Sequence, residues 1–338
     1  MMAIVFAWDE IRMNTPLIPT ESLIVDHAGC KLAVTTAGAG DLIILMHGWP
    51  ELGRSWRHLI APLVNAGYRV AIPDMRGYGA SDKPADPEQY TLNIVAADME
   101  AIAHALGYKT FIAIGHDWGA LAAWGTAVRL GPSKVCAVFS MSVPYAPPPP
   151  IPFNDLMEAL YPDRFFYIRY FQTVGVGEAE LEAADTRQAL KNIYWSICGQ
   201  GIQSFLGKSP PRDAKLLDAF GEAPEGPLSF MDDEELSAYA EAFRKGGWRG
   251  PLNWYRNFDR NAAEVRALPD AIVHQPSGFL AGGLDPVLLM FPSQLETMRA
   301  FCADYRIEKL IPGAGHWVQQ EAPEETIATV LKFLQTLR

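Results

Sequence analysis

The chain has 338 residues, of which 49% are hydrophobic and 20% charged, and its 28 Lys and Arg against 39 Asp and Glu give a formal net charge of −11 at pH 7. The length and composition are typical of a globular protein that buries a large core. The acidic balance argues against nucleic acid or an anionic membrane surface as a partner, because a phosphate-binding face needs clustered Lys and Arg.

Targeting and redox features are few. No apolar run reaches the roughly 20 residues that span a bilayer. The apolar opening segment, residues 1–8, has no basic leader and runs into Asp9 and Glu10, so we expect no secretory signal. The cysteines show no Cys-x-x-Cys spacing, which indicates free thiols in a reducing, cytoplasmic setting rather than a disulfide framework or zinc site. They are Cys30, Cys136, Cys198 and Cys302.

Short apolar runs alternate with helical patterns over the first 145 residues, which predicts an α/β protein with a mostly parallel sheet covered by helices. The runs are almost continuously apolar, as expected for strands buried on both faces. The third run leads into small and apolar residues at 119–128, which suit a buried helix. The strand candidates are residues 42–46, 68–74, 110–115 and 134–140.

Prolines then interrupt this pattern, at Pro144 and at residues 147–150, because proline cannot donate a ladder hydrogen bond. Residues 154–260 follow with a helical, aromatic pattern and no clear strand. Beyond Leu268 the strand-and-helix pattern returns. The expected elements are strands at residues 278–282 and 307–311 and a helix at residues 323–337 with one apolar face.

The simplest organisation is a core with a helical insertion. We expect residues 1–145 and 263–338 to form an α/β core, and residues 146–262 to form a helical cap, or lid, domain.

Residues 115–119, Gly-His-Asp-Trp-Gly, stand between the third strand candidate and the buried helix. A Gly-x-nucleophile-x-Gly segment between strand and helix forms a sharp elbow, whose glycines permit a strained turn and close packing. The central side chain, here Asp117, then projects at the carboxyl end of the sheet, where such sheets bind ligands. Taken alone, Asp117 could equally be a surface residue in a Gly-containing turn.

Two later loops supply the partners that a nucleophile needs. Asp285 follows one late strand candidate, and His316 follows the next. The order nucleophile, acid, histidine is that of the α/β-hydrolase triad, so we expect Asp117, Asp285 and His316 to form one. Singly, Asp285 would be a turn or capping residue and His316 a surface histidine.

Residues 47–50, His-Gly-Trp-Pro, follow the first strand candidate and complete the expected site. An oxyanion hole in this fold uses the amide after the nucleophile and one from this early loop, hence the amides of Trp118 and Trp49. The indoles of Trp49, Trp118 and Trp317 are either core packing or the lining of an apolar pocket; three on three site loops favour the pocket.

The chain resembles the soluble-type epoxide hydrolases of the α/β-hydrolase fold from about Ser22 onward. The matching segments are residues 47–51, 55–57, 66–70, 74–79, 115–119 and 315–317. These segments are shared with haloalkane and haloacetate dehalogenases, so they indicate a hydrolase with an aspartate nucleophile rather than its substrate.

The insertion carries the more discriminating resemblance. Residues 249–257 resemble the epoxide hydrolase cap segment with one acidic tyrosine, which implies Tyr255; residues 167–172 resemble the segment with the other, which implies Tyr167. Tyr170 lies three residues further on and would share a helix face with Tyr167, so spacing does not choose between them. The expected substrate pocket also includes His47, Pro50, Trp317, Gln172 and Tyr170.

The resemblance implies hydrolysis of a small-molecule epoxide to a vicinal diol through an alkyl ester on Asp117, without metal or cofactor, by a monomer or homodimer. One alternative is a dehalogenase that uses the same nucleophile. A second is a noncatalytic ligand-binding protein that keeps the fold, against which the complete triad and both tyrosines argue.

Overall fold

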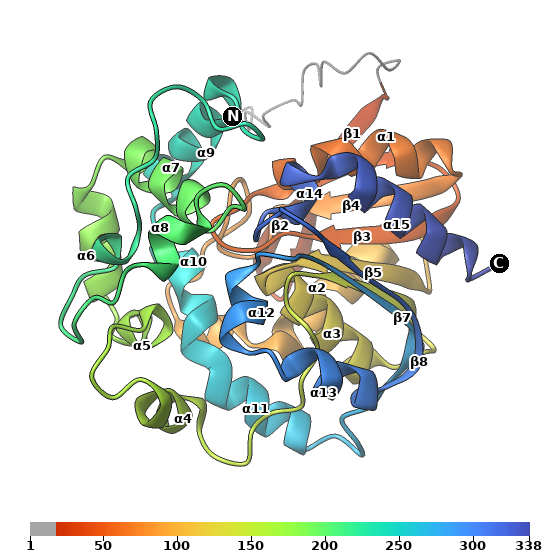
Figure 1. The fold of residues 1–338 in the computed structure, drawn as a ribbon. Coiled ribbons are helices and arrows are strands. Elements are labelled where there is room, and N and C mark those ends of the chain that lie inside the picture. The colour runs from red at the N-terminus through yellow and green to blue at the C-terminus, as the bar shows by residue number, and fades with distance from the viewer. Residues whose placement is uncertain (1–17) are drawn as a thin grey trace.

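The computed structural model describes residues 18–338; the apolar opening segment lies outside them. Its centre is an eight-stranded sheet of order β1-β2-β4-β3-β5-β6-β7-β8 (Figure 1). The strands are β1 (Thr20–His27), β2 (Cys30–Gly38), β3 (Asp41–Met46), β4 (Tyr68–Pro73), β5 (Phe111–His116), β6 (Val135–Met141), β7 (Val273–Gly282) and β8 (Cys302–Ile311).

The predicted α/β sheet is confirmed, and so are all six strand candidates, within a few residues except for longer amino-terminal ends of β7 and β8. Strands β3 to β8 pair in parallel. Strands β1 and β2 were not predicted. They pair antiparallel with each other, and β2 also pairs antiparallel with β4.

Helices cover both faces of the sheet, which explains the uninterrupted apolar strands. In β3, Ile43 and Leu45 pack with α1 and α15, while Leu42 and Ile44 pack on the opposite face with α2 and α3. The expected buried helix is α3, and the expected carboxyl-terminal helix is α15. The core helices are α1 (Arg57–Asn65), α2 (Leu92–Ala105), α3 (Trp118–Leu130), α12 (Pro286–Met290), α13 (Gln294–Phe301), α14 (Val318–Glu321) and α15 (Pro323–Gln335).

The chain between β6 and β7 is helical, as expected, and its green-to-cyan helices gather on one side of the core (Figure 1). The expected boundary at residues 262/263 falls inside α11, and the helices continue four residues further. They are α4 (Phe153–Leu160), α5 (Tyr167–Gln172), α6 (Val176–Ala183), α7 (Thr186–Ser196), α8 (Ile202–Leu206), α9 (Asp233–Gly246), α10 (Arg249–Asn253) and α11 (Phe258–Arg266). Short 3₁₀ helices are η1 (Gly53–Trp56), η2 (Pro87–Tyr90), η3 (Leu217–Ala219) and η4 (Trp254–Asn257).

The strand register brings the expected site loops to one edge. Met46 pairs with Gly115 across β3 and β5, and His116 pairs with Met141 across β5 and β6. Parallel neighbours therefore end together, so the loops after these strands meet. Within residues 18–338, no helix combines the length and the apolar character needed to cross a bilayer.

Candidate active site

Asp117 occupies a strained turn between β5 and α3. Its backbone has φ 54° and ψ −120°, a conformation that is rare outside glycine. A Cβ on Gly119 would lie 1.9 Å from the Met46 carbonyl oxygen, and one on Gly115 would lie 1.9 Å from the Gly119 carbonyl oxygen. The elbow predicted from the Gly-His-Asp-Trp-Gly motif is thus present, and both glycines are required by close backbone approach.

His316 and Asp285 converge on this turn. Nε2 of His316 lies 3.4 Å from Oδ2 of Asp117, and Nδ1 lies 3.1 Å from Oδ2 of Asp285. Asp285 is fully buried at the start of α12, where its Oδ1 accepts the Val287 amide. The structure therefore brings the three residues of the expected triad together, with the imidazole between two carboxylates.

Electrostatics favour the ionised form of this group. Burial opposes the charge on Asp117, but the hydrogen bond and charge of His316, together with the charge of His116, outweigh it and lower the pKa of Asp117. Burial likewise opposes protonation of His316, but Asp285 and Asp117 raise its pKa well above the usual range. Asp117 and His316 thus form an ion pair.

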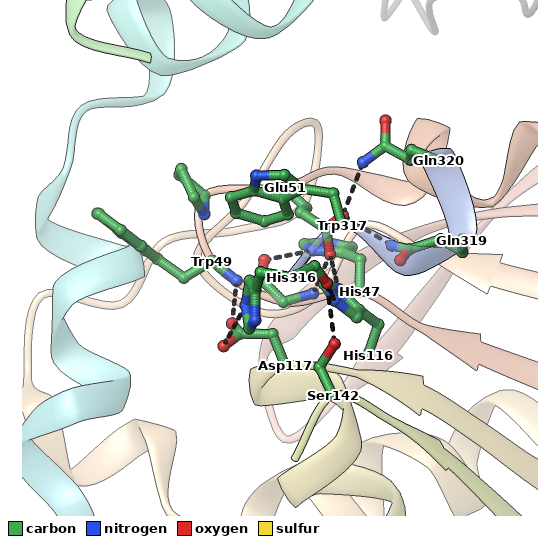
Figure 2. A network of polar contacts seen from close by, with 12 residues as sticks. His47, Trp49, Glu51, His116, Asp117, Ser142, His316, Trp317, Gln319 and Gln320 are labelled. Atoms are coloured by element: carbon green, nitrogen blue, oxygen red, sulfur yellow. Dashed lines mark hydrogen bonds and ion pairs between the residues drawn. The ribbon is translucent and has the colours of Figure 1, made fainter. Parts of the chain in front are cut away.

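A backbone amide completes the surroundings of the Asp117 carboxylate. The amide of Trp49 donates to Oδ1 at 2.7 Å (Figure 2). The amides of Trp49 and Trp118 were both expected at this position. Among the described residues, the Trp49 amide bonds the Asp117 carboxylate, whereas the amide of Trp118, the first residue of α3, does not. Gly48 permits the approach, because a Cβ there would lie 2.4 Å from the Asp117 side chain.

Tyr255 and Tyr167 lie together, close enough to Asp117 for its negative charge to act on both phenols. Tyr255, in η4, is 3% exposed, and its ring lies 5.7 Å from that of Tyr167 and 5.0 Å from that of Trp118. Burial, reinforced by the negative charge of Asp117, raises the pKa of both phenols above the usual range. Both hydroxyls therefore keep their protons at neutral pH, as a proton donor must.

Tyr170 faces elsewhere. Its hydroxyl donates at 2.7 Å to Glu180 of α6, whose carboxylate also accepts the amides of Leu216 and Leu217. Gln172 has a different place: its amide nitrogen donates to the carbonyls of Ile168 and Tyr255, each at 2.8 Å, and so ties α5 to η4.

The remaining expected pocket residues are buried, and their polar atoms have partners within the protein. His47 accepts the Met75 amide at Nε2 and contacts the Gly48 carbonyl at Nδ1; burial lowers its pKa, which matches this neutral tautomer. The carbonyl of Pro50 accepts the Tyr194 hydroxyl at 2.9 Å.

Trp317 is fully buried, and its ring centre lies 4.8 Å from that of His316. Its indole N–H donates to the carbonyl of Tyr194 at 2.8 Å, so the indole joins α7 to the His316 loop.

Two further buried residues, Glu51 and His116, were not predicted to belong to the site, although they lie in the motifs at residues 47–51 and 115–119. Glu51 and His116 are fully buried, and their side chains lie 2.8 Å apart (Figure 2). Nε2 of His116 lies 2.7 Å from the carbonyl oxygen of His316, which can only accept. The sequence feature that could have indicated a role is an ionisable residue within each of two otherwise apolar segments. Such side chains are rarely buried unless they are paired with another polar group.

The Glu51 carboxylate also accepts the Gly48 amide and the side-chain amides of Gln319 and Gln320. Burial would raise the pKa of Glu51, but the charge of His116 and its hydrogen bond outweigh burial and lower it. Glu51 is therefore ionised. His116 therefore faces an oxygen acceptor at each ring nitrogen.

Comparison with known proteins agrees with this geometry. Residues 41–174 match the family model for the α/β hydrolase fold. The chain is 39% identical over 322 residues to epoxide hydrolase A of Mycobacterium tuberculosis, covering 94% of this chain and 98% of that protein. It is 31% identical to epoxide hydrolase 3 of Siraitia grosvenorii, covering 93% and 98%.

Solved structures that resemble this chain are also epoxide hydrolases. An epoxide hydrolase from an endophytic Streptomyces is 35% identical with a TM-score of 0.88, covering 94% of this chain and 96% of that one. Epoxide hydrolase A from Mycobacterium thermoresistibile is 38% identical with a TM-score of 0.86, covering 94% and 98%. The strained aspartate turn, the histidine between two carboxylates and these relationships together lead to one assignment: the chain belongs to the epoxide hydrolase family of α/β hydrolases.

Proposed function

We propose that this protein hydrolyses epoxides to vicinal diols through an alkyl ester on Asp117. The observation that carries the proposal is the placement of two protonated phenols, Tyr167 and Tyr255, near a carboxylate that His316 and Trp49 keep ionised and oriented. A carboxylate suits backside displacement at saturated carbon, and the departing alkoxide needs acid.

In the first step, Oδ2 of Asp117 attacks an epoxide carbon and the carbon–oxygen bond of the ring breaks. Oδ1 is engaged by the Trp49 amide and becomes the ester carbonyl oxygen. Tyr167 and Tyr255 donate hydrogen bonds to the ring oxygen, and one of them transfers its proton. The hydroxyl of Tyr170 is already bonded to Glu180, which favours Tyr167 as the partner of Tyr255.

Before the second step, the proton that His316 carries in the free protein passes through solvent to the tyrosinate left by ring opening, which restores the phenol and leaves a neutral imidazole. In the second step, this neutral imidazole takes a proton from water, and the water oxygen attacks the ester carbonyl carbon. Ester formation removes the negative charge of Asp117, one of the two carboxylates that raise the pKa of His316. The pKa of the imidazole therefore falls, so that its neutral form, which can accept a proton, is available at the stage that needs it, while Asp285 keeps the ring oriented. The Trp49 amide, with that of Trp118, stabilises the oxyanion; one such donor contributes on the order of 10²–10³ in rate. On collapse, the bond between the carbonyl carbon and the alkoxy oxygen breaks and the hydroxyl proton of the intermediate goes to that oxygen. The diol is released, and Asp117 is again ionised beside protonated His316.

The helical insertion acts as the cap in this proposal. It supplies both phenols, and Gln172 holds their two segments together. The core, residues 1–145 and 263–338, supplies Asp117, Asp285 and His316, so the substrate binds between the two parts. His47, Pro50 and Trp317 contribute to the wall of the pocket, and their polar atoms bond to other parts of the protein rather than to substrate.

A cytoplasmic location fits the four free thiols, and the protein acts as a monomer or homodimer on a small-molecule epoxide. The test is diol formation from styrene-type, aliphatic and fatty-acid epoxides, with halide release from alkyl halides measured beside it. We expect diol from at least one epoxide class, and loss of this activity by about 10⁴-fold or more in Asp117→Asn. Halide release without diol would establish the dehalogenase alternative, and tight epoxide binding without turnover the binding-protein alternative.

A further inference from the structure

The loop that carries His316 is held by a carboxylate that takes no part in the proposed chemistry. Glu321, the last residue of α14, accepts the Gly315 amide at 3.0 Å through Oε2 and the Trp317 amide at 3.0 Å through Oε1. These amides belong to the residues immediately before and after His316. One side chain thus fixes the backbone on both sides of the proposed base.

The same carboxylate joins the loop to the helical insertion. Oε2 of Glu321 also accepts the amide of Gly199, in the turn after α7, at 2.7 Å. Two residues earlier, the carbonyl of Ile197 accepts the His316 amide at 2.8 Å. Packing is tight here, since a Cβ on Gly315 would lie 2.4 Å from the Gly199 nitrogen.

The chemistry of these contacts requires a carboxylate. Three backbone N–H groups converge on two oxygens, and a carboxylate offers enough acceptor sites for all three without a donor of its own. Burial raises the pKa of Glu321, and the three amides oppose this rise. A glutamine would present one oxygen and would turn an NH₂ group toward at least one of these amides. Unpaired buried amides cost free energy, so the loop would shift to find other partners.

The rest of the His316 backbone is also fixed. Its carbonyl oxygen accepts the Ser142 hydroxyl at 2.8 Å and Nε2 of His116 at 2.7 Å. Glu321 therefore completes a set of bonds that leaves the imidazole little freedom relative to Asp285 and Asp117.

We propose that Glu321 is a positioning residue for the second step: by binding the amides of Gly315, Trp317 and Gly199, it sets the His316 imidazole for proton abstraction from water and couples that setting to the insertion. This inference rests on the proposed function. His316 acts as the base only in ester hydrolysis, so loss of Glu321 slows hydrolysis more than ester formation.

The test compares Glu321→Gln with Glu324→Gln, a control that removes an exposed carboxylate from the first turn of α15 nearby. Ester formation and ester hydrolysis are measured separately by rapid quench and intact-protein mass, with each rate constant normalised to the titrated active sites. We expect the ratio of hydrolysis to ester formation to fall about 10- to 100-fold in Glu321→Gln, the range that a displacement near 1 Å produces. Glu324→Gln keeps the wild-type ratio.

Glu321→Asp is a second variant for the case in which Glu321→Gln does not fold. It keeps the carboxylate but shortens the side chain. We expect a smaller fall of the same ratio and a shift in the pH profile of hydrolysis. A scaffold role alone would lower the titratable fraction and leave the ratio per active site unchanged, and that result in either variant would overturn the inference. A wild-type protein that forms no ester fails the proposed function instead, so the two failures are distinguishable.

Discussion

The Nε2 atom of His316 lies 3.4 Å from Oδ2 of Asp117, so the free protein holds the proposed base against the proposed nucleophile as an ion pair. The pair has to separate when Asp117 becomes an ester. The imidazole then faces an uncharged carbonyl group, and a water molecule between them would be positioned for attack. The two groups thus serve successive steps from one arrangement.

Replacing His316 by Gln should therefore arrest the reaction after the first step. The Asp117 carboxylate and both phenols remain, so ester formation continues, although Asp117 loses the stabilising charge of the imidazole. We expect intact-protein mass spectrometry to show an adduct with the mass of the substrate within one turnover. Absence of any adduct, at substrate concentrations where binding is saturated, would contradict the two-step scheme.

The phenols should affect the first step alone. Tyr255→Phe removes a proton donor from the leaving oxygen, and placed general acids contribute about 10²–10⁴-fold. We expect a fall in that range in the rate of ester formation, with little change in ester hydrolysis. Tyr167→Phe should behave similarly, whereas Tyr170→Phe, whose hydroxyl bonds Glu180, should form the ester at close to the wild-type rate. Equal losses in both steps for Tyr255→Phe would argue against the acid role.

Much of this site could be predicted because its chemistry depends on local sequence. The glycines of the Asp117 elbow are dictated by backbone contacts, and the loops after successive parallel strands must meet at one edge. The choice between Tyr167 and Tyr170 could not be predicted, because residues three apart share a helix face. Glu180, from the next helix, accepts the Tyr170 hydroxyl, which favours Tyr167 as the acid.

Two other features depend on tertiary structure in the same way. The hairpin of β1 and β2 turns at Ala28 and Gly29, both with positive φ, and alanine is an uncommon residue at such a position. Glu51 and His116 are 65 residues apart in the chain, so the sequence marks each as an ionisable residue beside apolar ones but does not show that they pair.

The pH dependence of the two steps should differ. The pKa of Asp117 is lowered and that of Tyr255 is raised. Asp117 is therefore ionised and Tyr255 protonated between about pH 6 and 10, and the rate of ester formation should be flat in that interval. Hydrolysis needs neutral His316, so its rate should fall as pH drops through the pKa of this group in the ester form. Stopped-flow tryptophan fluorescence separates the two; an acid limb near neutrality in ester formation would contradict the assignment.

The buried pair of Arg76 and Asp98 should dominate stability near the core–insertion contact. Each side chain is 1% exposed, two hydrogen bonds join them, and the Arg76 carbonyl accepts the Trp254 indole N–H. Asp98→Asn leaves the guanidinium buried without its counter-charge, so we expect a loss of about 3–5 kcal/mol in the free energy of unfolding, measured with urea.

The matched control on the same helix is Glu100→Gln, which breaks an ion pair with Lys134 whose side chains are 40% and 44% exposed. We expect a change within about 1 kcal/mol there, because solvent screens such pairs. If both variants lost a similar free energy of unfolding, burial of the Arg76–Asp98 pair would not be the reason for the effect of Asp98→Asn.

The most direct test is a single turnover in water enriched in ¹⁸O, with protein in excess over epoxide. If Asp117 forms the ester, solvent oxygen enters the Asp117 carboxylate, and the first diol released carries no label. Mass spectrometry of the peptide that contains Asp117 and of the diol reads both products. Label in the diol of this first turnover, with an unlabelled Asp117, would mean that water attacks the epoxide directly and would contradict the account.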